Sequence, residues 1–376
     1  MKKILFITHE SSRTGAPFIV LYLMQWIKKY QPQVEMDVLT LRDGPLRDAL
    51  EPLVTNYFTV PQENTGPLRF TERIKLKIKV KQPPNRREQF IASLAASDYD
   101  LVYANTIVSI PLAAGIKRFN SKTRFIAHVH ELNAIVRLLL PNFKKFDPFI
   151  DHYIAASDLV RKNLIDNWQV DADRIDRIYE FSRIAVDIDN RYQKEYFKIG
   201  GSGFVHWRKG VDLFLQTAIQ LRNILTDFDQ IQFEWVGKVS DKERIILEED
   251  IRKANLTDQF KLIGQVDNPS KYFNDFDVFL MTSREDPFPL VCIEVGMLGI
   301  PIICFDGATG SQEIINQGGG VVVPYLDTDA MAKQIQTYFL DRNLLKDHGE
   351  KNKALFSKLS PEHLCPQIWE LLSAIK

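Results

Sequence analysis

The stretch Ser283–Pro301, SREDPFPLVCIEVGMLGIP, predicts a helix between two buried strands. The apolar run before it and PIICF after it have the length and composition of such strands. Proline in the first turn, Gly299 at the C-terminal cap and Pro301 beyond it are typical of helix boundaries. A strand, a helix and a second strand in this order favour an α/β fold.

Two carboxylates in this stretch are unusual for a purely structural helix. At 100° per residue, Glu294 falls within the apolar arc of the helix, between Leu290 and Leu298. Burying it unpaired would cost several kcal/mol, so we expect it to have a partner. Asp286 lies in the turn after the first strand, where open α/β sheets bind ligands. The alternative is a core salt bridge for Glu294 and a helix-capping role for Asp286.

Composition limits the class of protein without selecting a function. A chain of 376 residues is too long for one core and fits two domains. With 48 Lys and Arg against 48 Asp and Glu, the net charge is zero, so no overall field recruits nucleic acid. Cys292, Cys304 and Cys365 have no metal-ligand spacing and are expected to be reduced thiols.

We expect a cytoplasmic protein that contacts a membrane only at its surface. The N-terminal run ILFI is too short for a signal peptide, and no run approaches the ~20 apolar residues of a spanning helix. In residues 67–87, basic residues alternate with Ile, Leu and Val. This segment is either a solvated edge strand or a contact with anionic lipid head groups, which residues 138–146, LLLPNFKKF, would extend.

Strand and helix patterns alternate through two parts of the chain. We expect strands at 4–7, 36–41, 100–104, 124–130 and 152–156, and again at 233–237, 260–266, 278–282, 302–305 and 321–323. The polar stretch 187–198 separates the two sets. This predicts two doubly wound, Rossmann-like domains, at 1–180 and 195–360, followed by an amphipathic helix at 361–376.

Two turns rich in small residues precede helices. Gly15 and Ala16 stand just before Pro17, and the turn from Gly201 to Gly210 follows a strand. Helix N-termini and exposed amides attract anions, and Lys209 at such an N-terminus is unfavourable unless an anion is present. The alternatives are a tight packing turn at the first site and a solvated Arg-Lys turn at the second.

Two histidines and a glutamate end the strand expected at 124–130. Because side chains alternate along a strand, His128 and His130 face the same side, at the edge where substrates meet an open sheet. Glu131 follows them. Zinc binding is an alternative, but the sequence offers no clear third residue to coordinate the metal, so we predict no metal site.

Together these motifs resemble the retaining glycosyltransferases of family 4, whose GT-B fold has two Rossmann-like domains facing across a cleft. Asp286 and Glu294 have the spacing of the family's glutamate-x7-glutamate signature. The resemblance implies that Glu294 holds the ribose hydroxyls of a nucleotide-sugar and that Asp286 contacts the donor sugar. Aspartate is one methylene shorter than the usual glutamate. Pro289 replaces a glycine and has no N–H, so the amides of Leu290 and Val291 would take the diphosphate.

The resemblance extends to the two small-residue turns. It places Gly15 and Ala16 against the donor and makes Lys209 a cation that neutralises the leaving diphosphate. Gly203 occupies the usual position of the family's arginine, and Arg208 is the adjacent candidate to replace that arginine. The loop FDGATGSQEII, with Glu313, resembles the family's glycine loop near the donor.

The family's strand-end histidine corresponds to His130, with Glu131 beside it on the acceptor side and His128 in a structural role. With Asp286 and Lys209, His130 completes the expected catalytic set. The resemblance implies transfer of a sugar from a nucleotide diphosphate-sugar, held by the C-terminal domain, to a glycan or lipid-linked hydroxyl held by the N-terminal domain. It also implies retention of configuration, no cofactor and no obligatory metal, and a C-terminal helix that packs back on the N-terminal domain. The alternatives are a nucleotide-sugar epimerase on the same fold and a non-catalytic nucleotide-sugar or glycan-binding protein.

Overall fold

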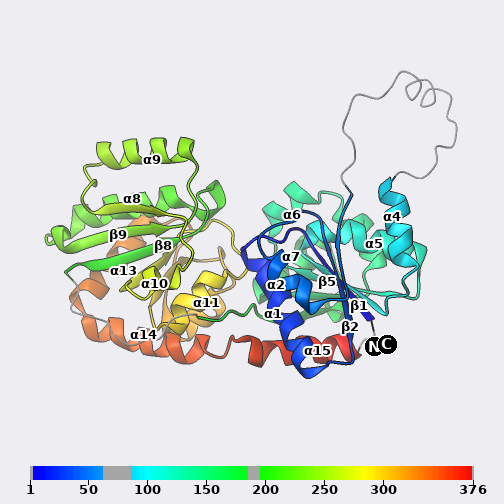
Figure 1. Cartoon of the computed structure of the whole chain (residues 1–376). Helices are drawn as coiled ribbons and strands as arrows, with labels where there is room; N and C mark the ends of the chain where they lie inside the picture. Colours follow the sequence, from blue (N-terminus) through cyan, green and yellow to red (C-terminus); the bar gives the residue numbers. More distant parts are fainter. Residues whose placement is uncertain (1–2, 62–85, 185–194, 375–376) are drawn as a thin grey trace, which may run out of the picture.

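In the computed structural model, which describes residues 3–61, 86–184 and 195–374, the strands form two parallel sheets with helices on their faces (Figure 1). The strand orders are β3-β2-β1-β4-β5-β6-β7 and β10-β9-β8-β11-β12-β13. In both sheets the chain starts near the middle, winds to one edge and then returns to wind to the other. This is the doubly wound arrangement, so the predicted α/β fold of two Rossmann-like domains is confirmed.

The first sheet and its helices lie within residues 3–177. The strands are β1 (Lys3–Thr8), β2 (Glu35–Thr40), β3 (Asn56–Thr59), β4 (Leu101–Asn105), β5 (Arg124–Val129), β6 (His152–Ala155) and β7 (Ile175–Arg177). The helices are α1 (Gly15–Tyr30), α2 (Arg47–Leu50), α4 (Arg86–Ala95), α5 (Ile110–Phe119), α6 (Asn133–Leu139) and α7 (Asp158–Trp168).

The second sheet spans residues 197–323. Its strands are β8 (Phe197–Ser202), β9 (Ile231–Val236), β10 (Phe260–Gly264), β11 (Val278–Met281), β12 (Ile302–Phe305) and β13 (Gly320–Val323). The helices are α8 (Val211–Ile224), α9 (Asp241–Lys253), α10 (Ser270–Phe273), α11 (Leu290–Met297), α12 (Gln312–Ile314), α13 (Thr328–Leu340), α14 (Arg342–Phe356) and α15 (Pro361–Ala374).

Most of the predicted strands are buried on both faces, although the partly exposed edge strands β10 and β13 were predicted as well. In β1, for example, Ile4, Phe6 and Ile7 are fully buried, as parallel strands covered by helices require. Strands β3 and β7 were not predicted. They are short edge strands with exposed residues, so the apolar signal of a central strand is missing.

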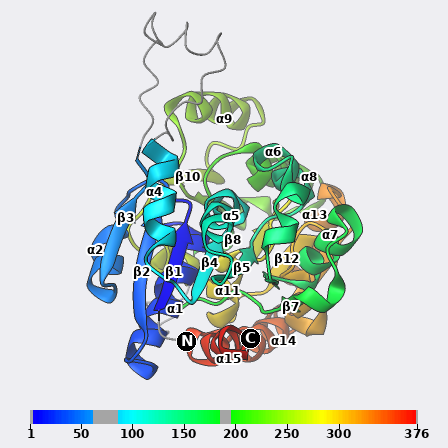
Figure 2. The ribbon, with the colours of Figure 1, turned by 90° about the vertical axis from the view of Figure 1, so that its right-hand side faces the viewer.

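The C-terminal helix α15 lies against the first domain. Figures 1 and 2 show α14 and α15 running along one side of the molecule, and α15 contacts α1. The rings of Trp26 and Trp369 lie 6.5 Å apart, and Arg183 pairs with Glu362 at 2.9 Å. Leu364 and Ile368 of α15 join the apolar core of the first sheet.

The membrane prediction falls mainly on residues that are not described here, because 62–85 contain most of the basic segment. Within the described ranges, no helix is both long enough and apolar enough to cross a membrane. In residues 138–146, the apolar segment expected to extend the membrane contact, Leu138 and Leu139 at the end of α6 are 71% and 56% exposed. The three cysteines are buried and free of disulfides, as expected.

Candidate functional site

A cleft of about 650 Å³ lies between the two sheets and receives every predicted site residue. Its walls come from loops that follow the carboxyl ends of strands, such as His9 after β1 and His130 after β5. This is where open α/β sheets bind ligands. The predicted residues that line the cleft are Gly15, Ala16, His130, Glu131, Gly203, Arg208, Lys209, Asp286, Leu290, Val291 and Glu294.

The N-termini of two helices meet in this cleft. A Cβ placed on Gly15, the first residue of α1, would lie 3.6 Å from Cγ of Leu290, the first residue of α11. Neither helix has an acidic residue in its first turn or a side-chain cap. Because the first amides of a helix lack intrahelical partners, both N-termini present positive potential to the same space. A helix from each domain can therefore contribute to binding one anion.

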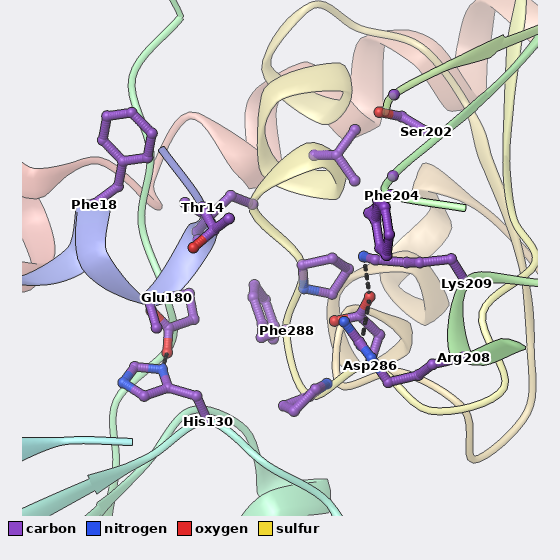
Figure 3. Close-up of a pocket in the computed structure, with 18 of the residues that line it drawn as sticks. Thr14, Phe18, His130, Glu180, Ser202, Phe204, Arg208, Lys209, Asp286 and Phe288 are labelled. Carbon is purple, nitrogen blue, oxygen red and sulfur yellow. Dashed lines mark hydrogen bonds and ion pairs between the residues drawn. The ribbon is translucent and has the colours of Figure 1, made fainter. Parts of the chain in front are cut away.

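Asp286 holds two cations at the wall of the cleft (Figure 3). Its Oδ2 lies 2.5 Å from Nζ of Lys209 and 3.2 Å from Nη1 of Arg208. Burial raises the pKa of Asp286, but the two cations outweigh it and the pKa is lowered. Asp286 does not cap α11, whose N-cap is Pro289. The negative charge that we expected near Lys209 is therefore supplied by the protein itself, through Asp286. Together, Asp286, Lys209 and Arg208 carry one net positive charge.

Gly203 makes room for Lys209. It adopts a φ of +143°, and a Cβ there would lie 2.9 Å from Cδ of Lys209. An arginine at this position, as in the family pattern, would displace the lysine side chain from its present course. Arg208 instead supplies the second cation, and its Nη1 also donates to the carbonyl of Glu285 at 2.8 Å.

Glu294 has a hydroxyl partner. Ser182 Oγ donates to its Oε1 at 2.9 Å, and Glu294 takes part in none of the ion pairs among the described residues. The core salt bridge considered above is therefore not what the structure forms. Burial raises the pKa of Glu294 to about 7, against the opposing effect of the Ser182 hydrogen bond. The side chain lines the cleft, and its carboxylate is available for further hydrogen bonds.

His130 is held between two acceptors on the opposite wall (Figure 3). Its Nδ1 lies 2.5 Å from Glu180 Oε1, and its Nε2 lies 2.7 Å from Asn105 Oδ1. The amide of Asn105 is oriented by its other atom, because Nδ2 donates to the carbonyl of Ala16. Both ring nitrogens therefore face acceptors, an arrangement that favours the imidazolium. Burial lowers its pKa, but Glu180 and Glu131 more than offset this, so the pKa of His130 is raised.

The metal alternative can be judged from the same residues. His128, His130 and Glu180 are the one group among the described residues whose ligand atoms lie within 4.8 Å of one another. His128 is fully buried, and its Nδ1 bonds to the hydroxyl of Tyr103 at 2.5 Å. Burial and the adjacent charge of His130 keep its pKa well below the usual value. Glu180 is thus the third group that the sequence did not offer, and it pairs directly with His130 Nδ1 at 2.5 Å.

Three other carboxylates serve helix N-termini or backbone amides. Glu131 accepts from the backbone N–H of His130 at 2.9 Å, so its carboxylate bonds within its own loop. Glu285 accepts from the amide of Ala134 at the start of α6, at 3.0 Å. Glu313 accepts from the first amides of α7, each at 3.1 Å. The last two contacts join the domains, so Glu313 caps a helix of the opposite domain and not its own.

Sequence reasoning missed Glu180, His9 and Ser182. Glu180 and Ser182 lie after the edge strand β7, in a segment with no periodic pattern, and they approach the site only through tertiary folding. His9 could have been found, because it directly follows the end of β1. It lines the cleft, and burial lowers its pKa.

Two family models match this chain and together cover most of it. Residues 19–181 match the model described as Glycosyltransferase Family 4, and residues 187–355 match the one described as Glycosyl transferases group 1. The first covers the sheet β1–β7, and the second covers β8–β13.

Several curated relatives are named for bacterial polysaccharide or lipopolysaccharide biosynthesis, and another is the UDP-N-acetylglucosamine–peptide N-acetylglucosaminyltransferase GtfA subunit of Streptococcus agalactiae. The lipopolysaccharide core biosynthesis mannosyltransferase LpcC of Rhizobium leguminosarum bv. viciae is 26% identical over 159 residues, which are 40% of this chain and 43% of LpcC. The amylovoran biosynthesis glycosyltransferase AmsD of Erwinia amylovora is 30% identical over 109 residues, 29% of this chain and 31% of AmsD. The matched stretches thus span less than half of either relative.

Solved structures match over the whole chain. Alr3699/HepE of Anabaena, in complex with UDP-glucose, has a TM-score of 0.78 and 19% identity, with 100% of both chains covered. TarM has a TM-score of 0.75 and 14% identity, with 100% of this chain and 99% of TarM covered. At these identities the likeness establishes the shared two-domain fold.

Proposed function

Because this chain belongs to the family 4 glycosyltransferases of the GT-B fold, we propose that it moves a sugar from a nucleotide diphosphate-sugar to a hydroxyl acceptor with retention of configuration. One observation carries the proposal. A single cleft between the domains is lined by four features: Asp286 with its partners Lys209 and Arg208, the N-terminus of α1, the N-terminus of α11, and Glu294. Cations and helix N-termini suit a diphosphate, and a carboxylate next to them suits the two hydroxyls of a ribose.

The donor lies along α11 in this proposal. Glu294, one helical turn into α11, accepts the ribose hydroxyls, and the amides of Leu290 and Val291 hold the diphosphate at the N-terminus. Lys209 stabilises the charge that develops on the leaving diphosphate. Preorganised charge of this kind is usually the largest contribution to catalysis.

The acceptor approaches from the first domain, where Gly15, Ala16 and His130 line the cleft. In front-face attack, the donor phosphate takes the acceptor proton, so no side chain need act as the base. This agrees with the surroundings of His130, whose two ring nitrogens both face acceptors and so direct no free lone pair at an incoming hydroxyl. Closure of the domains excludes water and limits donor hydrolysis.

The acceptor class follows from the relatives' names. LpcC and AmsD are named for lipopolysaccharide core and amylovoran biosynthesis, so we propose a glycan or lipid-linked acceptor in polysaccharide or glycolipid assembly. The reaction would then take place on the cytoplasmic side, with the basic segment 67–87 against anionic lipid. Co-sedimentation with vesicles that contain anionic lipid, and not with neutral vesicles, tests the membrane contact.

We propose that the transfer needs no metal, because Lys209, Arg208 and the helix N-termini supply the positive charge that a metal would otherwise bring. Initial rates should be unchanged when EDTA is added to protein freed of bound metal. A rate that falls in EDTA and returns with one divalent ion would contradict this.

The experiment that tests the function itself combines binding with product analysis. Calorimetry with UDP, GDP, dTDP and ADP should identify one nucleotide that binds, and UDP is the first choice because HepE was solved with UDP-glucose. The matching nucleotide-sugars are then incubated with candidate acceptors, and the anomeric configuration of the product is determined by NMR. Absence of binding by all four nucleotides would refute the proposal, and an inverted product would refute retention.

A further inference from the structure

A second cavity, of about 600 Å³, lies between the domains and shares no lining residue with the cleft. The two cavities adjoin the same segments of chain. Trp207 and Glu285 line the second cavity, whereas their neighbours Arg208 and Asp286 line the cleft. Its wall on the side of the first domain comes from the N-terminal end of α6 and from one side of α7. The volume is within the range of about 300–1,000 Å³ for small-molecule sites.

Two aromatic rings are held exposed at this cavity. Trp207 is 55% exposed and Tyr325 is 53% exposed. Arg284 contacts both residues. Its guanidinium lies 5.8 Å from the centroid of the Trp207 ring, its Nη1 donates to the backbone carbonyl of Trp207 at 2.8 Å, and its own carbonyl accepts from the Tyr325 hydroxyl at 3.3 Å. Arg284 is itself anchored by Asp212 at 2.7 Å. Both rings therefore lie beside one anchored side chain at the wall of the cavity.

A buried amide in the same cavity lacks a partner. Asn163 of α7 is only 6% exposed, and its Oδ1 accepts from Asn167 Nδ2 at 3.0 Å. Its Nδ2 has no hydrogen-bond partner within the described part of the chain. Since buried donors are nearly always paired, this donor beside the cavity still lacks the partner that such groups have.

The charges at the cavity exclude an anionic ligand. Glu285, Asp166 and Asp306 line it, against Lys162 and the Arg284 that is already paired. A phosphate or carboxylate would meet this excess of negative charge. A neutral ligand with many hydroxyls would instead donate to the carboxylates and accept from the amides.

We propose that this second cavity binds an uncharged hexose or N-acetylhexosamine unit. The C–H face of the sugar stacks on Trp207 and Tyr325, as apolar faces pack on aromatic rings, and one of its oxygens accepts from Asn163 Nδ2. Asn163 belongs to the first domain and both aromatic residues belong to the second, so the sugar bridges the domains. The inference rests on this cavity alone and stands whether or not the donor assignment is correct.

Tryptophan fluorescence tests the proposal, because none of the five tryptophans lines the cleft and only Trp207 lines the second cavity. The probes are the methyl glycosides of glucose, galactose, mannose and N-acetylglucosamine. Acrylamide quenching is measured with and without each sugar, and the Trp207 component is the difference between the wild type and Trp207→Phe. Stacking covers one of the two ring faces, so at least one sugar should lower quenching of this component about twofold. Trp369→Phe is the matched control, which should retain the protection.

Variants of the residues that line the cavity distinguish a site with several contacts from sugar stacking on Trp207 alone. Asn163→Ala and Tyr325→Ala should each abolish the protection, whereas Tyr30→Ala, at a tyrosine that is 48% exposed on α1, should not. Tyr325 is exposed, so its variant should fold even if Asn163→Ala does not. The proposal is overturned if no sugar protects Trp207, if protection survives in Tyr325→Ala, or if inorganic phosphate protects as well as the sugars.

Discussion

The raised pKa of Glu294 makes the affinity for nucleotide depend on pH. In the free protein, burial holds this pKa at about 7. Ribose hydroxyls donate to the ionised carboxylate, so the bound state favours ionisation and binding releases a proton below that pH. Affinity should therefore rise as the pH approaches neutrality.

The size of this effect follows from the fraction of Glu294 that is ionised. With a pKa of about 7, the ionised fraction rises about twentyfold between about pH 5.5 and pH 7.5. If only the carboxylate binds the ribose, the association constant rises by the same factor. In Glu294→Gln, neutral hydrogen bonds replace charged ones, and affinity at the upper pH should fall about tenfold.

The assay is calorimetric titration with the nucleotide that binds, across this pH range, on the wild type and Glu294→Gln. Ionisation of the nucleotide phosphates contributes equally to both proteins and cancels in the ratio of their affinities. Glu350→Gln, at an exposed glutamate of α14, is the matched control and should follow the wild type. Parallel pH curves for the wild type and Glu294→Gln would refute the ribose role of Glu294.

The raised pKa of Glu294 also makes the stability of the fold depend on pH, in the opposite direction to the affinity for nucleotide. Because folding raises the pKa of Glu294 from 4.5 to about 7, the folded protein binds more protons than the unfolded chain between these values. The free energy of unfolding should therefore fall as the pH rises from about 4.5 to 7, by up to about 3 kcal/mol. Glu294→Gln should remove this dependence, which denaturant titrations at several pH values would measure.

Three further variants test other parts of the cleft. Lys209→Met should lower kcat by about 100-fold to 1,000-fold, the usual loss for one preorganised charge, and a loss below threefold in steady-state kinetics would contradict its role. Gly203→Ala should lower kcat by at least about tenfold, because its Cβ displaces the Lys209 side chain. Gly318→Ala, at a φ of +108° beside the Lys351 side chain and outside both cavities, shares the backbone strain and should not. Glu313→Gln weakens the cap on α7 by about 1 kcal/mol. The domains should then close less completely, and KM should rise about fivefold. An unchanged KM would show that this contact does not contribute to domain closure.

Much of the fold could be read from the sequence because central parallel strands are buried on both faces. Their apolar runs, such as those of β1, β11 and β12, stand out from the amphipathic helices between them. The edge strands β3 and β7 lack this contrast, and their pairing depends on the sheet already being present. A strand of this kind cannot be identified without its neighbour.

The predicted site residues were those attached to local signals. Glu294 was recognisable as a carboxylate in an apolar arc, and Lys209 as a cation at a helix start. The contacts they make were not recognisable, since Ser182 lies 112 positions from Glu294 and Asp286 lies 77 positions from Lys209 along the chain. No periodicity relates residues at such separations.

The sequence by itself therefore determined the α/β class, the doubly wound order and the loops from which the cleft is built, because these follow from local burial patterns and from turn chemistry. Only the tertiary structure decided the charge state of the site. It places Asp286 against Lys209 and Arg208, and it holds His130 between Glu180 and Asn105. The physical reason is that a pKa depends on burial and on charges within a few ångströms, and the chain acquires both only when each domain folds.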